Sequence, residues 1–306
     1  MTLVVAATEP GSIWLLVDRR LSCEGRAPRD DARKIMLLDT DDGKAILGYA
    51  GLGATALATE PADWMSAVLR GRRLALEQSL GVLAEATKKQ LPQHLVRLPK
   101  NAVAGHNVIV PAFVQNEARL YSIDLVFSAD RKNYAFRWTR HVNNITPAVP
   151  RTPRLAIGGS GAIYLMRRKE WRRELLRILK AYDREQLSAH VVADHFAALN
   201  HEVYRNLVSG TVGPRCIVAW RNGRDGARRG GGGHQFYTDK TRDASSPSLP
   251  IIANGMDIRA LADLIMPRFM RNFQAMGTGQ PPAELDKDEM NAELACLPNK
   301  PDENLR

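Results

Sequence analysis

Thr2 follows the initiator methionine, so removal of Met1 would leave a threonine at the N-terminus of the chain. An N-terminal threonine carries a hydroxyl that can attack a carbonyl and an α-amine that can accept the hydroxyl proton. An α-amine titrates near pH ~8, so a useful fraction of it is neutral and basic at neutral pH. These groups predict nucleophilic catalysis.

Three residues further along the chain have groups that this chemistry requires. Lys34 supplies a cation, which favours the alkoxide of the nucleophile and lowers the pKa of a neighbouring amine by like-charge repulsion. Asp18 supplies a carboxylate that would hold the lysine in place. The backbone N–H of Gly48 would receive the oxyanion of a tetrahedral intermediate. Together with Thr2, these residues predict a threonine hydrolase.

Several short segments occur in a characteristic order along the chain. After Thr2 they are Val17-Asp18-Arg19-Arg20, Lys34-Ile35, Gly48-Tyr49-Ala50-Gly51, Ile157-Gly158-Gly159-Ser160-Gly161 and Arg205-Asn206-Leu207-Val208-Ser209-Gly210. In this order the chain resembles proteasome β-type subunits and their bacterial relatives, which are N-terminal nucleophile hydrolases. The resemblance extends from residue 2 to about residue 221.

The resemblance implies that Thr2 is the nucleophile and that its amine, acting through a water molecule, is the general base. Lys34 would tune the pKa values of this pair, and Asp18 would hold Lys34. An acyl-enzyme ester on Thr2 would form with its oxyanion at the Gly48 N–H, and water would then hydrolyse the ester. These steps need no metal ion and no organic cofactor.

The later segments match residues that surround the threonine amine in the family. The hydroxyls of Ser160 and Ser209 would hydrogen-bond to this amine. The family has an acidic residue where this chain has Asn206, so an oxygen acceptor is kept and a negative charge is lost. The residues that match the primary specificity pocket are Leu21, Ala32, Ile46 and Ala50. Their small, apolar side chains predict a preference for apolar substrate residues.

The favoured interpretation is a proteasome-like threonine peptidase that cleaves peptide amide bonds. Two alternatives stay open. One is a catalytically inactive scaffold or binding subunit of the same fold, which the loss of charge at Asn206 supports. The other is a small-molecule amidase of the same superfamily. The resemblance also implies a ring or other closed homo-oligomer acting on peptides or unfolded proteins, and it leaves an ATPase or other protein partner open.

Two other patterns have simpler explanations. Gly51-Leu52-Gly53-Ala54-Thr55-Ala56 matches a dinucleotide-binding fingerprint, but no strand ending in Asp or Glu follows about twenty residues on. A glycine-rich turn near the oxyanion site explains it better. His190 and His195 would point about 140° apart on a helix, so a metal site is not expected.

Charge and cysteine content limit the partners. The formal net charge is +10, and the segment from Met166 to Lys180 holds seven basic residues against two Glu. A solvated helix face explains this segment better than a nucleic-acid site, because aromatic interleaving is sparse and no nucleic-acid motif accompanies it.

Three separated cysteines favour a reducing compartment. No apolar stretch approaches the ~20 residues of a membrane span, so we expect a cytoplasmic protein without a membrane partner.

Alternating strand and helix segments must position these residues. Strands are expected at 3–7, 13–17, 34–38, 44–49, 108–114, 118–127, 134–138, 155–157 and 216–220, and helices within 54–90 and at 162–182 and 187–206. This order permits several α+β arrangements, and the resemblance selects a four-layer αββα sandwich of the N-terminal nucleophile hydrolase type. We expect this domain to span 1–221. Residues 222–306 should form a C-terminal extension with a Gly/Ser/Pro-rich linker, one helix near 257–276 and an acidic mobile tail.

Overall fold

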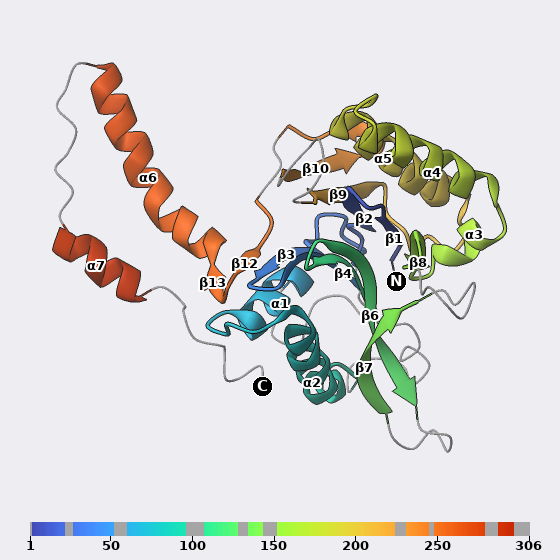
Figure 1. The fold of residues 1–306 in the computed structure, drawn as a ribbon, viewed down its shortest axis with the longest axis horizontal. Helices are drawn as coiled ribbons and strands as arrows, with labels where there is room; N and C mark the ends of the chain where they lie inside the picture. Colours follow the sequence, from blue (N-terminus) through green and yellow to red (C-terminus); the bar gives the residue numbers. More distant parts are fainter. Residues whose placement is uncertain are drawn as a thin grey trace.

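Two β-sheets and the helices that cover them form a mixed α+β fold (Figure 1). The computed structural model describes residues 2–21, 27–51, 60–95, 107–127, 134–142, 152–223, 231–244, 248–278 and 287–296. The α+β class expected from the order of segments is confirmed. Among the described helices, none is both long and apolar enough to cross a membrane.

The first sheet has the N-terminal hairpin near its centre. Its strands, in spatial order, are β11 (Thr241–Arg242), β10 (Gly232–Thr238), β9 (Arg215–Asn222), β2 (Ser12–Asp18), β1 (Val4–Thr8) and β8 (Leu155–Gly158). Every residue of β1 and β2 is buried, which is the pattern of strands covered on both faces. The antiparallel register pairs Val4 with Val17. It therefore brings the start of β1 beside the end of β2.

The second sheet is built mainly from consecutive antiparallel strands. In spatial order they are β13 (Met256–Asp257), β12 (Ile251–Ala253), β3 (Ile35–Thr40), β4 (Gly43–Ala50), β5 (Asn107–Val114), β6 (Glu117–Phe127) and β7 (Tyr134–His141). The exception is β12, which pairs parallel to β3. Residues near the start of β3 and the end of β4 lie at the same end of this sheet, because Ile35 pairs with Gly48.

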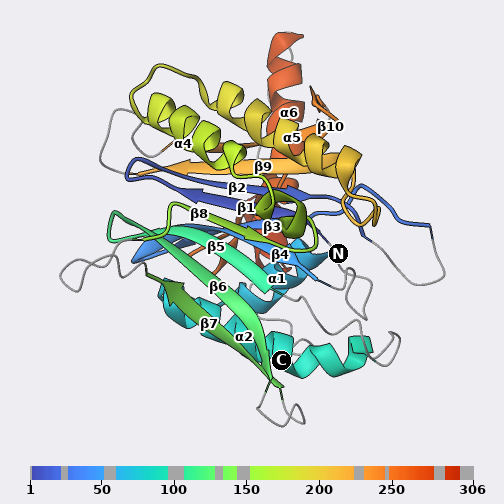
Figure 2. The same cartoon turned by 90° about the vertical axis from the view of Figure 1, so that its right-hand side faces the viewer.

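The two sheets face each other across a buried apolar cluster (Figure 2). This cluster joins Leu15 of β2 to Ile46 of β4 and to Ile109 of β5. Its members are buried because each sheet turns one row of apolar side chains inward. The elements that carry Thr2, Asp18 and Lys34 are thus fixed to a rigid double layer of strands.

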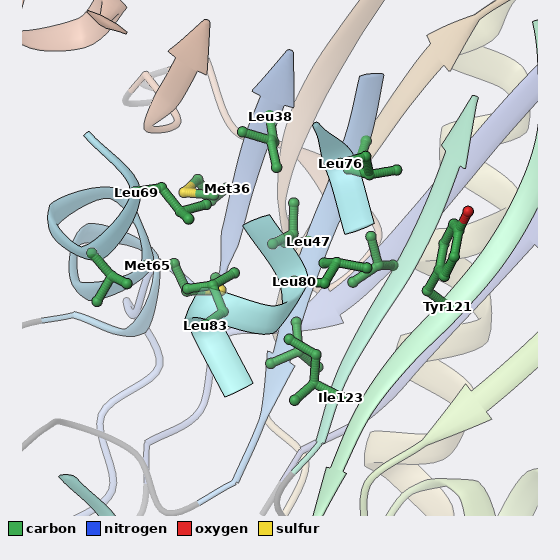
Figure 3. Close-up of a cluster of buried hydrophobic side chains, with 14 of the residues drawn as sticks. Met36, Leu38, Leu47, Met65, Leu69, Leu76, Leu80, Leu83, Tyr121 and Ile123 are labelled. Carbon is green, nitrogen blue, oxygen red and sulfur yellow. The ribbon is translucent and has the colours of Figure 1, made fainter. Parts of the chain in front are cut away.

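Helices cover the other face of each sheet. Helices α1 (Pro61–Leu69) and α2 (Leu76–Leu95) pack on the second sheet, where Leu80 and Leu83 join a cluster with Met36 and Leu47 (Figure 3). Helices α4 (Glu170–Asp183) and α5 (Ala189–Asn206) pack on the first sheet. There Trp14 lies at the centre of the cluster, with its ring stacked on Phe196 at 5.9 Å.

The segment at 162–182 differs from the single helix that the sequence predicts. It forms helix α3 (Ala162–Met166) and helix α4, separated by residues 167–169. The indole nitrogen of Trp171 donates to the carbonyl of Leu165 at 2.9 Å. The same carbonyl also accepts from the backbone N–H of Arg168 at 3.2 Å. A tertiary contact, which helical periodicity does not encode, therefore accompanies the break.

Residues after 221 supply strands that the sequence analysis does not predict. Strand β10 begins with Gly232 and Gly233, residues of low strand propensity. A Cβ on Gly233 would lie 2.6 Å from the Trp220 ring, so the indole occupies the space of the absent side chain. Strands β10–β13 extend both sheets at their edges. The boundary at residue 221 stays a prediction.

The C-terminal part contains two helices. Helix α6 (Ile258–Gly277) occupies the segment where the sequence predicts one, and Asp257 caps it by accepting a hydrogen bond from the backbone N–H of Ala260. Helix α7 (Lys287–Cys296) lies within the acidic tail, where the sequence analysis predicts no helix. Figure 1 shows α6 projecting from the body of the molecule.

Candidate active site

Thr2 lies just before β1 and is enclosed by the glycine turn that follows β8. Only 1% of its surface is exposed, and its carbonyl oxygen accepts a hydrogen bond from the N–H of Gly161 at 3.3 Å. Gly159 has φ +77°, and a Cβ at this position would lie 1.9 Å from the carbonyl oxygen of Thr2. Glycine is therefore required at 159, both for its backbone conformation and for the close approach to Thr2.

The side chain of Lys34 reaches Thr2 from the start of β3. Its Nζ donates to Thr2 Oγ1 at 2.6 Å, to the carbonyl oxygen of Arg20 at 2.6 Å and to Asp18 Oδ1 at 3.3 Å. An ammonium has three protons to donate, and these three acceptors use all of them. Burial lowers the pKa of Lys34, and the negative charge of Asp18 opposes this shift. The lowered pKa increases the neutral fraction of the lysine at a given pH.

Asp18 is fully buried at the end of β2. Its Oδ1 accepts from the backbone N–H of Leu3 at 3.0 Å as well as from Lys34. Its Oδ2 accepts from the backbone N–H groups of Arg20 and Gly213, each at 3.1 Å. A buried carboxylate with donors on both oxygens is held in one orientation. Asp18 therefore connects the first strand, the loop after β2 and the loop before β9.

The structure brings Thr2, Asp18 and Lys34 into one hydrogen-bonded cluster. Their roles in catalysis stay predictions, since contact alone is not activity. Sequence reasoning did not identify Gly213, whose contribution is a backbone N–H. A backbone donor from a loop far along the chain leaves no residue-type signal in the sequence, and only the folded arrangement reveals it.

Ser160 and Ser209 are joined through a residue that the sequence analysis missed. The Oγ1 of Thr211 lies 2.7 Å from Ser160 Oγ and 2.9 Å from Ser209 Oγ. The three hydroxyls form a hydrogen-bonded chain between the glycine turn after β8 and the loop after α5. Thr211 follows the Ser209-Gly210 pair directly, which is the only signal that the sequence offers for it.

Asn206 does not join this hydroxyl chain. Its Nδ2 donates to the carbonyl oxygen of Glu202 at 2.8 Å within helix α5, and its side chain is exposed. It also lines a cleft of about 420 Å³ between α4 and α5, whose apolar floor includes Trp171 and Leu175. Neither Thr2 nor Lys34 lines this cleft. The side chain of Asn206 is thus bonded within its own helix, and its predicted role beside the threonine amine stays a prediction.

Gly48 has a packing role that the sequence analysis did not foresee. A Cβ at this position would lie 2.6 Å from Leu15 Cδ2 and 2.9 Å from Val17 Cγ2. The missing side chain thus lets the two sheets approach each other near the end of β4. This observation explains the glycine without reference to an oxyanion, and the predicted role of its N–H stays a prediction.

The four residues matched to a specificity pocket are all buried: Leu21 at 4%, Ala32 at 0%, Ile46 at 0% and Ala50 at 1% exposure. Ile46 and Ala50 belong to the cluster between the sheets. Ala32 exchanges hydrogen bonds with Arg19, whose guanidinium donates to its carbonyl at 3.2 Å. The remainder of the glycine-rich segment after Gly51, residues 52–59, lies outside the described residues.

No metal-binding group of three or more His, Cys, Asp or Glu side chains occurs among the described residues. Cys216 is buried beside Asp18, and burial raises the pKa of its thiol. A thiol with a raised pKa is a poor nucleophile. The hydroxyl of Thr2, by contrast, accepts a hydrogen bond from Lys34 Nζ.

No protein-family model matches the chain, and no curated protein matches it. Among solved structures, the chain is similar to Anbu (ancestral beta-subunit) from Yersinia bercovieri, at 14% identity and a TM-score of 0.41 over 71% of this chain and 80% of that one. It is similar to an Anbu (Gly-1) mutant from Hyphomicrobium sp. strain MC1, at 13% identity and a TM-score of 0.43, over 90% of this chain and 100% of that one. It is also similar to a chain of the helical assembly of the Anbu complex from Pseudomonas aeruginosa, at 12% identity and a TM-score of 0.44, over 93% of this chain and 98% of that one. At these identities and TM-scores, the likeness says nothing about the chemistry of the site.

Proposed function

We propose that the chain is a threonine-type N-terminal nucleophile hydrolase that cleaves peptide amide bonds after Met1 has been removed. The observation that carries the proposal is the 2.6 Å hydrogen bond from Lys34 Nζ to Thr2 Oγ1 inside a buried cluster. The fold would be the four-layer αββα sandwich of such hydrolases. Its catalytic unit would be built on residues 1–221, with strands β10–β13 added at the sheet edges.

The acylation step follows from the directions of the hydrogen bonds. Because Lys34 donates to Thr2 Oγ1, the threonine oxygen accepts, and its own proton is available to the free α-amine. The amine takes this proton, directly or through a water, as Oγ attacks the substrate carbonyl. The positive charge of Lys34 stabilises the developing alkoxide, and Asp18 keeps the ammonium aimed at it.

The second step regenerates the enzyme. The protonated amine gives its proton to the leaving amine of the substrate, and an ester on Thr2 remains. The freed amine then activates a water that hydrolyses this ester. We propose that the Gly48 N–H binds the oxyanion in both steps, that Ser160 and Ser209 orient the amine, and that apolar side chains near Ala50 receive an apolar substrate residue.

The proposal is tested by mass spectrometry of the purified protein with a threonine-directed β-lactone or epoxyketone. We expect loss of Met1 and a single adduct that peptide mapping assigns to Thr2. The matched control is Thr2→Ala, which should fold and take up no reagent. A folded wild-type chain with a free Thr2 that takes up no reagent would overturn the proposal.

A second candidate is an inactive scaffold of the same fold. It is favoured by the position of Asn206, which supplies neither charge nor contact to the hydroxyl chain. The same experiment separates the two, because a scaffold leaves Thr2 unmodified. If Thr2 is modified, the size of the assembly distinguishes a peptidase from a small-molecule amidase. A closed homo-oligomer, with or without an ATPase partner, fits peptides or unfolded proteins, whereas an open site fits small amides.

A further inference from the structure

Helix α6 presents an uncovered apolar face. None of its residues is buried in the described chain. Six large apolar side chains are between 40% and 66% exposed: Ile265, Met266, Phe269, Met270, Phe273 and Met276. We call these six the apolar face. The rings of Phe269 and Phe273 stack at a centroid distance of 6.5 Å.

The six residues form one continuous surface rather than a scatter. At 100° per residue, they fall within an arc of about 140° around the helix. Their spacing follows the i, i+3, i+4 pattern by which an amphipathic helix packs on a partner. In a soluble domain such a face is normally turned to the core, but here the helix projects from the body (Figure 1).

The last described helix of the chain packs elsewhere on α6. Arg268 Nη2 forms an ion pair with Glu293 of α7 at 2.7 Å. Arg268 lies about 130° from the centre of the apolar face. Helix α7 is therefore attached outside the face and leaves it open.

The area of the face suits a stable dimer. Multiplying the exposed fraction of each of the six residues by the size of its side chain gives a total exposed area on the order of 600 Å². A patch of this size on a monomer marks an interaction site. Two such faces would bury about 1,200 Å², which reaches the range of stable specific interfaces.

The charge pattern favours a second copy of the same chain as the partner. Between residues 263 and 277, the charged residues are Asp263, Arg268 and Arg271, and all lie outside the face. Asp263 forms an ion pair with Arg259 of its own helix. Residues at its edges, Asn272 and Gln274, are uncharged amides. Two identical faces can therefore meet without like-charge repulsion, although each chain has a net charge of +10. The face itself offers no charged side chain that could form an ion pair with a charged partner protein.

We propose that the apolar faces of two copies pack against each other as an antiparallel helix pair. The first turn of α6 is attached to the second sheet, so a parallel pair would bring two positively charged bodies side by side. An antiparallel pair places them at opposite ends of about 30 Å of helix. The two-fold axis passes near Met270, which lies midway between Ile265 and Met276 along the helix and at the rim of the face around it. The proposal rests on this face and not on the hydrolase chemistry.

The first test measures the mass of the full chain by light scattering over a dilution series. Wild type should be a dimer, or a multiple of one, that dissociates on dilution. Phe269→Glu should raise the dissociation constant by about 100-fold, because it places one charge in each half of the interface. The matched control is Arg271→Gln, which makes the same change in charge outside the face and should behave as wild type. A wild-type chain that is monomeric at every concentration would refute the proposal and leave the face to a different protein.

The second test fixes the direction of the pair by disulfide formation under mild oxidation. Met270→Cys lies on the proposed axis and should link to its own copy. Met276→Cys should not, because its partner residue in an antiparallel pair is Ile265. Peptide mapping separates these links from those of the native cysteines. Equal linking of both variants would indicate parallel helices and contradict the proposal.

These outcomes are separable from those of the hydrolase test. Adduct formation at Thr2 can be followed in the Phe269→Glu variant, since α6 projects from the body away from the N-terminus (Figure 1). Loss of the dimer with labelling retained would support both proposals. A dimer of wild-type chain that never takes up the reagent would support the helix pair alone.

Discussion

The three donor contacts of Lys34 make it the residue on which the proposed chemistry depends most. We expect Lys34→Met to reduce the rate of adduct formation at Thr2 by about 100-fold or more, the usual effect of removing one electrostatic stabiliser. Methionine preserves much of the volume of the side chain and removes all three donors. The rate is measured by the time course of the mass increase.

The same substitution should also reduce stability. It leaves the carboxylate of Asp18 buried without its cationic partner, and breaking a buried ion pair costs about 3–5 kcal/mol. The three backbone donors to Asp18 remain, so we expect the lower end of this range in urea unfolding. Lys88→Met, at an exposed position of α2, is the control and should change neither property. Labelling of Lys34→Met at the wild-type rate would remove Lys34 from the mechanism.

At the scale of elements, the turn after β8 controls the position of Thr2. We expect Gly159→Ala to destabilise the fold by about 2 kcal/mol or more and to abolish labelling, because the new Cβ meets the Thr2 carbonyl. Gly210→Ala is a matched control, since Gly210 also has a positive φ but has nothing within 4 Å of its Cβ position. The free energy of unfolding of Gly210→Ala should fall by about 1 kcal/mol. Its Thr2 should still take up the reagent. Equal effects of the two variants would show that backbone conformation, and not the contact with Thr2, is what matters.

The hairpin between β1 and β2 contains a buried carboxyl, Glu9. Burial raises its pKa, Asp183 adds to the shift, and Arg154 and Lys180 oppose it. A raised pKa in the folded state means that the fold binds the proton more tightly than the unfolded chain does. This contribution to stability is present below the unfolded pKa of about 4.3 and is lost as pH rises through the folded value.

We therefore expect Glu9→Gln to equal wild type in stability near pH 4 and to exceed it at pH 7 by about 1 kcal/mol. The free energy of unfolding is measured by urea titration at both pH values. Glu185→Gln, in the exposed turn before α5, should show no such difference. A wild-type chain that gains stability relative to Glu9→Gln as pH rises would contradict the sign.

Sequence reasoning was most successful where strands are long and regular. The hairpin at 3–17 and the pair at 34–49 were predicted within a residue or two, because apolar strands covered on both faces leave a clear pattern. The break between α3 and α4 was missed, since it depends on Trp171 reaching back to Leu165. Strand β10 was missed because its leading glycines are used for packing against Trp220. Thr211 and Gly213 were missed because loop contacts leave no periodicity.

At the scale of the whole molecule, the body and α6 are largely independent. A chain ending at Ala260 should fold, with a melting temperature within a few degrees of wild type, because no residue of α6 is buried. It keeps the Asp257 cap and the ion pair of Arg259 with Asp63, while losing the apolar face. Thermal unfolding and light scattering check this together. A truncated chain that aggregates or does not fold would show that α6 protects the body.

The burial of Thr2 places a constraint on how the protein is made. An aminopeptidase needs an extended, accessible N-terminus, whereas Thr2 precedes a strand held between β2 and β8. β8 begins about 150 residues later, so the sheet cannot close around Thr2 until that part has been synthesised. At about 5–20 residues per second, the interval lasts roughly 10–30 s. For the nucleophile proposed above, removal of Met1 would therefore have to precede closure of the sheet around Thr2.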